Sequence, residues 1–318
     1  MARDAGPSAY LLSYRSQDNE EDKRLNSQHD VIKHAILGGH LIHPSIPLSA
    51  TQTSIADIAC GTGIWLDDVR KTHFADVPAY EDSAPFLVGF DVNAHAFDHS
   101  IASAVKLIEH DCTKEFPSEY IGRFDLVNMR GLAYAVPRES FSHLISNAIK
   151  LLRPGGYLQW LETETRLFRQ YPLTADFTEA IDKINVERGY RGLVADMPQF
   201  MLRELIKPGS DYHPDTMSII NFNLLPGGIC RNTDLRSDPV NKRLSETVLE
   251  SVKLLLAASL EENRQESVTG LTQRISNEER DKTKNLMDAI ASSIEVGEVI
   301  AGGVFPHLVA QKPAESSL

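Results

Sequence analysis

The sequence predicts an α/β fold in which helices wind around both faces of a mainly parallel sheet. Between residues 53 and 162, short apolar runs alternate with segments of helical periodicity. Parallel strands joined by crossover helices produce this order. The chain has 318 residues, of which 42% are hydrophobic and 24% charged. It therefore has enough apolar material for a core and is not disordered as a whole.

The alternation defines the first elements one by one. A helix is expected over residues 20–37, because apolar positions recur among charges and the stretch ends at Gly38-Gly39. The expected strands then cover residues 54–60, 86–90, 105–110, 124–129 and 157–162. The expected helices between them cover residues 64–72, 94–103 and 138–152, and residues 73–85 are expected to form a long surface connection.

After residue 163 the alternation lapses. Helical patterns are expected at 177–187, 197–205, 245–262 and 276–294, with strand-like residues at 217–225 and a last β-like run at 296–311. The simplest interpretation is one α/β domain over residues 51–318 with helical cap insertions at about 166–207 and 244–294. A helical segment over residues 1–50 precedes it.

Charge and composition exclude several classes of function. The chain carries 32 Lys and Arg against 44 Asp and Glu, a net charge of −12, and its basic residues are scattered singly, so we expect no nucleic-acid partner. No stretch approaches the roughly 18 apolar residues of a membrane span, and no signal peptide is recognisable. Cys60, Cys112 and Cys230 form neither a disulfide framework nor a zinc motif. We therefore expect a reducing, cytoplasmic location.

The most informative stretch runs from Ile55 to Gly63 (IADIACGTG). An apolar strand ends there in a glycine turn that leads directly into a helix. Gly61 and Gly63 allow a close approach of ligand to backbone, and the helix start offers free N–H groups. The dinucleotide fingerprint fails because Leu66 stands where its third glycine belongs, and the phosphate-binding loop fails because no Lys-Ser/Thr pair follows.

What remains resembles the first motif of class I S-adenosylmethionine-dependent methyltransferases, with Ala59 where the family often has glycine. Matching features follow in order: a strand ending at Asp91, an acid at Asp111 after the third strand, and the turn Pro154-Gly155-Gly156 before the fifth. Each alone could be a capping acid, a turn former or a chain break. Their order and spacing favour the resemblance.

A finer resemblance connects the chain with fungal secondary-metabolite methyltransferases, a group that includes the gliotoxin-pathway N-methyltransferase. It is carried by Tyr14, Arg24-Leu25, Gln28-His29, Ile64-Trp65 and the run FPHLVAQKP at 305–313. The resemblance implies a Rossmann-like seven-stranded sheet, mostly parallel, whose last strand near 305–311 is antiparallel. It also implies that the helices of residues 1–50 form a lid over the cofactor.

The resemblance further implies S-adenosyl-L-methionine as the cofactor. In the family, the acid matching Asp91 binds the ribose and the acid matching Asp111 reads the adenine edge; Arg130 is a candidate partner of the methionine carboxylate. The expected cofactor-binding residues are Asp57, Ala59, Gly61, Gly63, Asp91, Val92, Asp111, Cys112, Met129 and Arg130.

The expected reaction is direct displacement of the methyl group by an O or N atom of a small, largely apolar specialised metabolite. Candidate catalytic residues are His29 and Glu162, with His110 and His143 as further possible bases, and Tyr134 and Trp160 are candidates for substrate binding. The cap supplies apolar and aromatic residues, although helix packing alone gives the same composition: Phe168, Phe177, Tyr190, Met197, Phe200 and Met201.

No metal-ligand cluster stands out, so metal-independent activity is expected. Two alternatives stay open at this point. The chain could bind the cofactor without methylating, as a regulatory protein, or it could use the same pocket for a different reaction such as a cyclisation.

Overall fold

The computed structural model describes most of the chain. The described residues are 20–49, 52–77, 84–101, 105–206, 217–227, 238–260, 264–265, 272–273, 275–296 and 300–314. Tyr14, Cys230 and residues 78–83 of the expected surface connection lie outside them.

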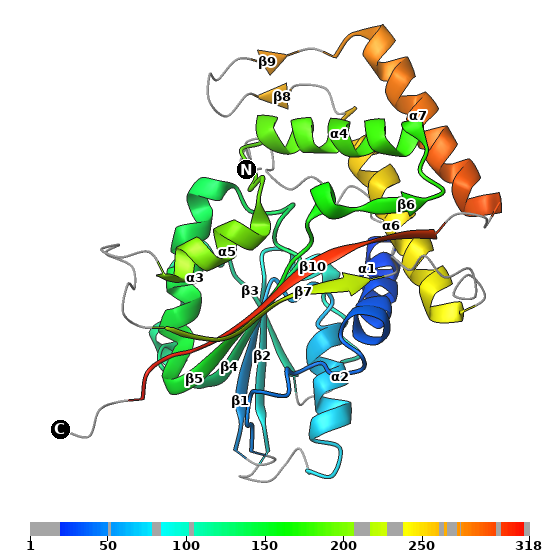
Figure 1. The fold of residues 1–318 in the computed structure, drawn as a ribbon. Coiled ribbons are helices and arrows are strands. Elements are labelled where there is room, and N and C mark those ends of the chain that lie inside the picture. Colours follow the sequence, from blue (N-terminus) through cyan, green and yellow to red (C-terminus); the bar gives the residue numbers. More distant parts are fainter. Residues whose placement is uncertain are drawn as a thin grey trace.

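A single large sheet carries the fold, and five of its strands are parallel neighbours (Figure 1). They lie in the order β3-β2-β1-β4-β5. Their bounds are Ser54–Ile58 (β1), Phe86–Asp91 (β2), Val105–Glu109 (β3), Phe124–Arg130 (β4) and Leu152–Leu161 (β5). The doubly wound, mainly parallel sheet predicted from the alternation is confirmed.

The far side of the sheet is antiparallel. Strand β10 (Ile300–Gln311) pairs antiparallel with β5, and β7 (Ser218–Gly227) and β6 (Arg169–Tyr171) both pair antiparallel with β10. The antiparallel last strand is thus confirmed. The sheet has eight strands instead of the expected seven, because β6 covers the first residues of β10. A strand of three residues is too short to show a period of two in the sequence.

Helices cover both faces of the parallel strands. On one face, Trp65 and Leu66 of α2 (Ile64–His73) pack on Ile55 of β1. On the other face, Phe141 of α3 (Arg138–Leu151) packs in the same cluster as Ala56. Strands that are buried on both sides read as continuous apolar runs, which is how the sequence presents them.

The remaining helices form a cap. Figure 1 shows α4 (Ala175–Tyr190), α6 (Pro239–Ala258) and α7 (Asn277–Val296) grouped beyond the carboxyl ends of the parallel strands, and these three helices contact one another. Helix α1 (Glu20–Val31) and the π-helical turn Ile32–Ile36 lie against α6. The two-residue strands β8 (Arg264–Gln265) and β9 (Thr272–Gln273) pair with each other.

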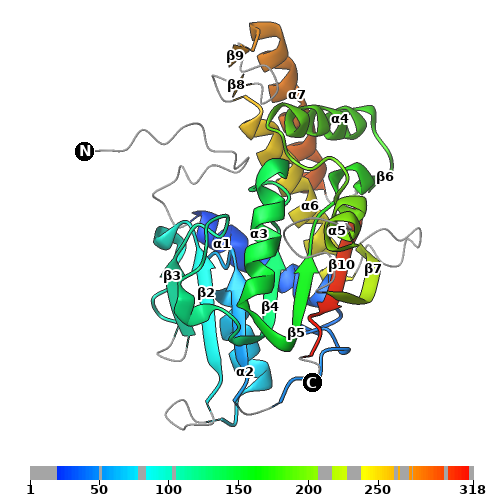
Figure 2. The same cartoon turned by 90° about the vertical axis from the view of Figure 1, so that its left-hand side faces the viewer.

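Helix α5 (Met197–Ile206) belongs to a different layer from the cap. Its Met197, Phe200 and Met201 join the cluster that holds Phe141 of α3, and the Phe141 and Phe200 rings meet edge to face at 5.3 Å. Figure 2 shows α3 beside strands β4 and β5. The segment that the sequence treats as one cap insertion is therefore divided between the cap and the face of the sheet.

Two local expectations were wrong. Residues 94–101 contain only a 3-10 turn, Ala94–Ala96, and not the helix expected over 94–103, whose residues 102–103 lie outside the description. The side chains of Asn93 and Asp98 accept bonds from the N–H groups of His95 and Ser100. Such local bonds compete with a helix.

The second wrong expectation concerns Pro154-Gly155-Gly156. This run lies within β5 and not before it, at an irregularity in the pairing with β4. A Cβ on Gly156 would lie 2.8 Å from the carbonyl oxygen of Phe124, so the close strand contact requires glycine there.

In the described part of the chain, every helix is too short or too polar to serve as a membrane span.

Candidate functional site

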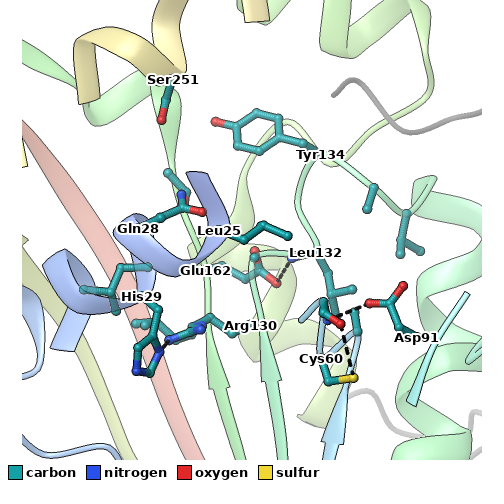
Figure 3. Close-up of a pocket in the computed structure, with 18 of the residues that line it drawn as sticks. Leu25, Gln28, His29, Cys60, Asp91, Arg130, Leu132, Tyr134, Glu162 and Ser251 are labelled. Carbon is teal, nitrogen blue, oxygen red and sulfur yellow. Dashed lines mark hydrogen bonds between the residues drawn. The ribbon is translucent and has the colours of Figure 1, made fainter. Parts of the chain in front are cut away.

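A cavity of about 490 Å³ lies at the carboxyl ends of the parallel strands. Open α/β sheets bind their ligands at this edge. The glycine turn, the ends of β2 to β5, helix α1 and helix α6 all contribute to its wall. Figure 3 shows Asp91 near the turn, His29 with Arg130 at another corner, and Tyr134 and Ser251 at the far end.

The glycine turn after β1 has the conformation that its sequence predicts. Gly61 and Gly63 have φ of 56° and 85°, and the Gly63 N–H donates to the Cys60 carbonyl at 2.9 Å. Ala59 has φ of 56°, a left-handed conformation in which a Cβ is strained. Ala59 and Gly61 line the cavity, so bare backbone faces it.

Asp91 joins the turn to the end of β2. Its Oδ2 accepts a hydrogen bond from the Gly61 N–H at 2.8 Å, and its Oδ1 accepts one from the Asn93 N–H at 2.9 Å. Burial raises the pKa of Asp91, while these backbone donors lower it. A carboxylate has about four acceptor positions, so these backbone donors do not occupy all of them.

Asp111 and Cys112 follow β3 and also line the cavity. Asp111 Oδ1 accepts from the N–H and the hydroxyl of Thr113, at 3.0 and 2.6 Å. Burial raises the pKa of Cys112 to about 12, so its thiol is protonated and is no nucleophile. His110 lies beside them, and its Nε2 is buried without a hydrogen-bond partner among the described residues. Val92 lines the cavity from an exposed position.

His29 and Arg130 meet at the wall below α1 (Figure 3). Arg130 Nη1 donates to His29 Nδ1 at 3.2 Å, and His29 Nε2 lies 2.9 Å from Asp68 Oδ2. Burial, followed by the charge of Arg130, lowers the pKa of His29 to about 4. The lone pair on His29 Nδ1 is therefore already engaged by Arg130, which leaves no free basic nitrogen.

Glu162 follows β5 and is buried against the cavity. Its Oε1 accepts from the Leu132 N–H at 2.9 Å and from Trp160 Nε1 at 2.8 Å, and its Oε2 accepts from the Ala133 N–H at 3.0 Å. Burial raises the pKa of Glu162 to about 7 although these donors lower it. The carboxylate also fastens the loop after β4 to β5.

Tyr134 stands on that loop and lines the cavity. Burial raises the pKa of Tyr134 to about 12, and the guanidinium of Arg188 lies 5.4 Å from its ring centroid. The Tyr134 hydroxyl points toward α6, where Ser251 stands (Figure 3). The walls around this end are mainly apolar and come from several elements: Leu25, Val31, Phe168, Leu244, Val248, Leu255 and Phe305.

Four predicted site residues are not among those that line the cavity: Asp57, Gly63, Met129 and Trp160. Asp57 is turned into the sheet, where its Oδ1 accepts from Asn128 Nδ2 at 2.8 Å and burial raises its pKa to about 7. Met129 and Trp160 are fully buried in the core. Trp160 Nε1 donates to Glu162 Oε1 without reaching the cavity itself. Gly63 caps α2 behind the turn.

Sequence reasoning missed the wall that α6 forms, where Thr247, Val248 and Ser251 line the cavity. The only signal for these residues is the amphipathic period of the helix, which does not separate a cavity wall from a packing face. Leu25 and Gln28 of α1 also line the cavity; the finer resemblance included both residues, but neither was among the expected site residues. Among the cap aromatics and methionines singled out from the sequence, only Phe168 lines the cavity, and His143 does not.

Within the described ranges, no group of three His, Cys, Asp or Glu residues could hold a metal ion.

The chain is similar to known fungal methyltransferases. It is 27% identical over 248 residues to methyltransferase grgD of a Penicillium species, a match that covers 77% of this chain and 82% of that protein. It is 29% identical over 180 residues to N-methyltransferase gliN of Aspergillus fumigatus, covering 54% of this chain and 58% of that protein. No family model matches the chain.

Among solved structures, the chain is similar to phosphoethanolamine N-methyltransferase 2 of Haemonchus contortus in complex with S-adenosyl-L-methionine. The sequence identity is 14%, the TM-score is 0.48, and the match covers 95% of this chain and 60% of that one.

In its sheet, its glycine turn and its sequence relatives, the chain resembles the class I S-adenosylmethionine-dependent methyltransferases, whose cofactor is S-adenosyl-L-methionine. Within this class, the chain resembles the methyltransferases of fungal secondary metabolism.

Proposed function

We propose that this enzyme methylates an O or N atom of a small, largely apolar specialised metabolite. One observation carries the proposal. A single cavity joins a polar end, formed by Asp91, Asp111 and Arg130, to an apolar end beneath α1 and α6. The polar end suits a nucleoside with a charged tail, and the apolar end suits a largely apolar acceptor. The name of the relative gliN, an N-methyltransferase, agrees with nitrogen as one acceptor atom.

The polar end fits S-adenosylmethionine. Asp91 keeps an acceptor position for the ribose hydroxyls, and Asp111 and Cys112, which the resemblance assigns to the adenine edge, line the same cavity. The backbone at Ala59 and Gly61 gives room for the amino-acid part, and Arg130 offers a cation for its carboxylate. When bound, the cofactor supplies a methyl group that its sulfonium activates for displacement.

The protein itself positions the acceptor and excludes water. Helix α1 would act as the lid, because Leu25, Gln28 and His29 reach over the turn and the strand ends. Holding two reactants in line supplies several kcal/mol of the barrier without any covalent step. A phenol acceptor gains from a base, whereas a neutral amine does not.

Of the two candidate bases, Glu162 is the better placed. It lines the cavity, and burial raises its pKa to about 7, so as a base near neutral pH it would take up a proton in exchange for one of its bonds from Leu132, Ala133 or Trp160. His29 is occupied by Arg130 and Asp68 and is better suited to orientation. Tyr134 remains the best candidate for hydrogen bonding to the acceptor.

The activity test is methyl transfer from labelled S-adenosylmethionine to a panel of phenols, amides and amines on apolar ring systems. We expect labelled product and S-adenosylhomocysteine with at least one member. Cofactor binding without turnover on any acceptor would contradict the proposal and favour a regulatory or cyclisation role.

The cofactor assignment predicts the effect of Asp91→Ala. The substitution removes the ribose acceptor and the brace on the Gly61 N–H, so the dissociation constant for S-adenosylhomocysteine should rise by at least about 100-fold. Isothermal titration calorimetry measures it. Asp76→Ala, which removes an exposed acid just after α2, should leave the constant unchanged. Equal affinities of the wild type and Asp91→Ala would refute the assignment.

A further inference from the structure

A chain of four polar side chains runs from the cavity to helix α2. Arg130 donates to His29, and His29 Nε2 lies 2.9 Å from Asp68 Oδ2. Lys33 Nζ donates to both oxygens of Asp68, at 2.9 and 2.7 Å. Of these four residues, only Arg130 and His29 line the cavity.

Hydrogen-bond chemistry fixes the proton positions along this chain. A guanidinium only donates, so His29 Nδ1 must be the acceptor of the Arg130 bond. The ring proton is then on Nε2, which donates to Asp68. Asp68 thereby selects the tautomer of His29 that can accept from Arg130, and it fixes the plane of the ring.

The charges do not cancel at the cavity. Lys33 pairs with Asp68, and the imidazole of His29 between Asp68 and Arg130 is neutral. In the described part of the chain, no carboxylate lies within ion-pair distance of Arg130, although the charges of Asp57 and Asp68 act on it from further away. The guanidinium therefore lines the cavity without a carboxylate bound directly to it.

We propose that Asp68 and His29 are positioning residues that hold Arg130 in the orientation that binds the carboxylate of the cofactor. This inference rests on the proposed function. His29 lies in α1, Lys33 in the π-helical turn that follows it and Asp68 in α2, so the same contacts fasten the lid and orient the guanidinium. Closure of α1 and recognition of the amino-acid tail are therefore one event.

The test compares two ligands that differ in the tail. S-adenosylhomocysteine has the amino-acid carboxylate, whereas 5′-methylthioadenosine has the same nucleoside and a thioether without it. Calorimetry on the full chain measures both affinities for the wild type, Asp68→Asn, Arg130→Met and their double variant. The matched control is Asp67→Asn, because Asp67 is the neighbouring acid of α2 and its ion pairs among the described residues are with Arg70 and Lys71 of its own helix.

We expect Asp68→Asn to weaken S-adenosylhomocysteine binding about tenfold and to leave 5′-methylthioadenosine within about twofold. Arg130→Met should show the same selectivity with a larger loss. The double variant should bind no more weakly than Arg130→Met, because Asp68 acts through Arg130. Asp67→Asn should change neither ligand.

The outcomes separate the two claims. If Arg130→Met weakens both ligands equally, Arg130 does not bind the carboxylate, and that part of the proposed function fails. If Arg130→Met is selective but Asp68→Asn is not, the positioning role is overturned while the proposed function stands.

A second pair of variants covers the case in which Asp68→Asn does not fold. His29→Gln keeps an acceptor for Arg130 and should preserve most of the selectivity, whereas His29→Ala should lose it. Equal behaviour of these two variants would also overturn the positioning role.

Discussion

At the scale of single residues, four buried titratable groups stand out because burial shifts their pKa values in opposite directions. It lowers those of His29 and His307 to about 4, and raises those of Asp57 and Glu162 to about 7. His307 lies in β10 with its ring 5.3 Å from that of His43. Its Nε2 is buried without a partner among the described residues.

His307 should make the fold sensitive to acid. Its folded pKa of about 4 lies below the usual 6.5, so between these values the unfolded chain holds a proton that the folded chain lacks. Stability is then lost as the pH falls from 6.5 towards 4. In His307→Gln, the free energy of unfolding should fall less over this range, by on the order of 2–3 kcal/mol.

Urea denaturation at pH 7, 5.5 and 4.5 measures this difference. Asp57 and Glu162 have the opposite pH dependence, but they are the same in both proteins and cancel in the comparison. His34→Gln, at an exposed histidine of the π-helical turn, is the control. Parallel stability curves for the wild type and His307→Gln would contradict the prediction.

At the scale of elements, the glycine turn depends on its neighbour strand. Gly89 of β2 lies beneath the turn, and a Cβ there would lie 2.7 Å from Cys60 Sγ and 2.8 Å from Leu107 Cδ2. Cys60 is buried, so its Sγ has little room to move, whereas Leu107 is half-buried. The residue that lets β1, β2 and β3 approach is therefore also the support of the cofactor site.

Gly89→Ala should destabilise the protein by about 1–3 kcal/mol through overpacking. It should also weaken S-adenosylhomocysteine binding, because Cys60 belongs to the turn. Gly189→Ala is the matched control. Gly189 lies in α4 with nothing within 4 Å of the added carbon, so this substitution should stabilise the protein by roughly 0.5–1 kcal/mol. Chemical denaturation should show that the free energy of unfolding falls in Gly89→Ala and rises in Gly189→Ala. An unchanged free energy of unfolding in Gly89→Ala would contradict close packing of Gly89 against the turn.

The elements also show how far the sequence could be interpreted. Strands and crossover helices were predictable because apolar runs alternate with helical periods in the sequence. Asp91, Asp111 and Glu162, the first two named from the family resemblance, line one cavity because the carboxyl ends of parallel strands meet at one edge. The helix expected at 94–103 failed because the Asn93 and Asp98 side chains form local bonds. The α6 wall could not be predicted, since its fold over the cavity depends on contacts with α4, α7 and β10.

At the scale of the whole molecule, one cavity connects the sheet, the lid helix and the cap. A ligand there should stabilise all three together, by about 2.7 kcal/mol at a concentration of 100 times its dissociation constant. With S-adenosylhomocysteine, we expect a higher melting temperature and slower amide hydrogen exchange in α1 (Glu20–Val31).

Differential scanning fluorimetry and exchange mass spectrometry measure the two effects. The Asp91→Ala variant at the same ligand concentration should show neither. Protection at the glycine turn without any in α1 would contradict the role of that helix as a lid.

Strand β10 occupies an interior position between β5 and β7, although it follows both in the chain. During synthesis, β5 and β7 emerge before β10, so the edge of each strand that pairs with β10 has no partner while α6 and α7 are translated. The antiparallel half of the sheet can form only by insertion, after residues 300–311 have emerged. Until then the edges of β5, β6 and β7 that pair with β10 are open, and open strand edges favour aggregation of a nascent chain.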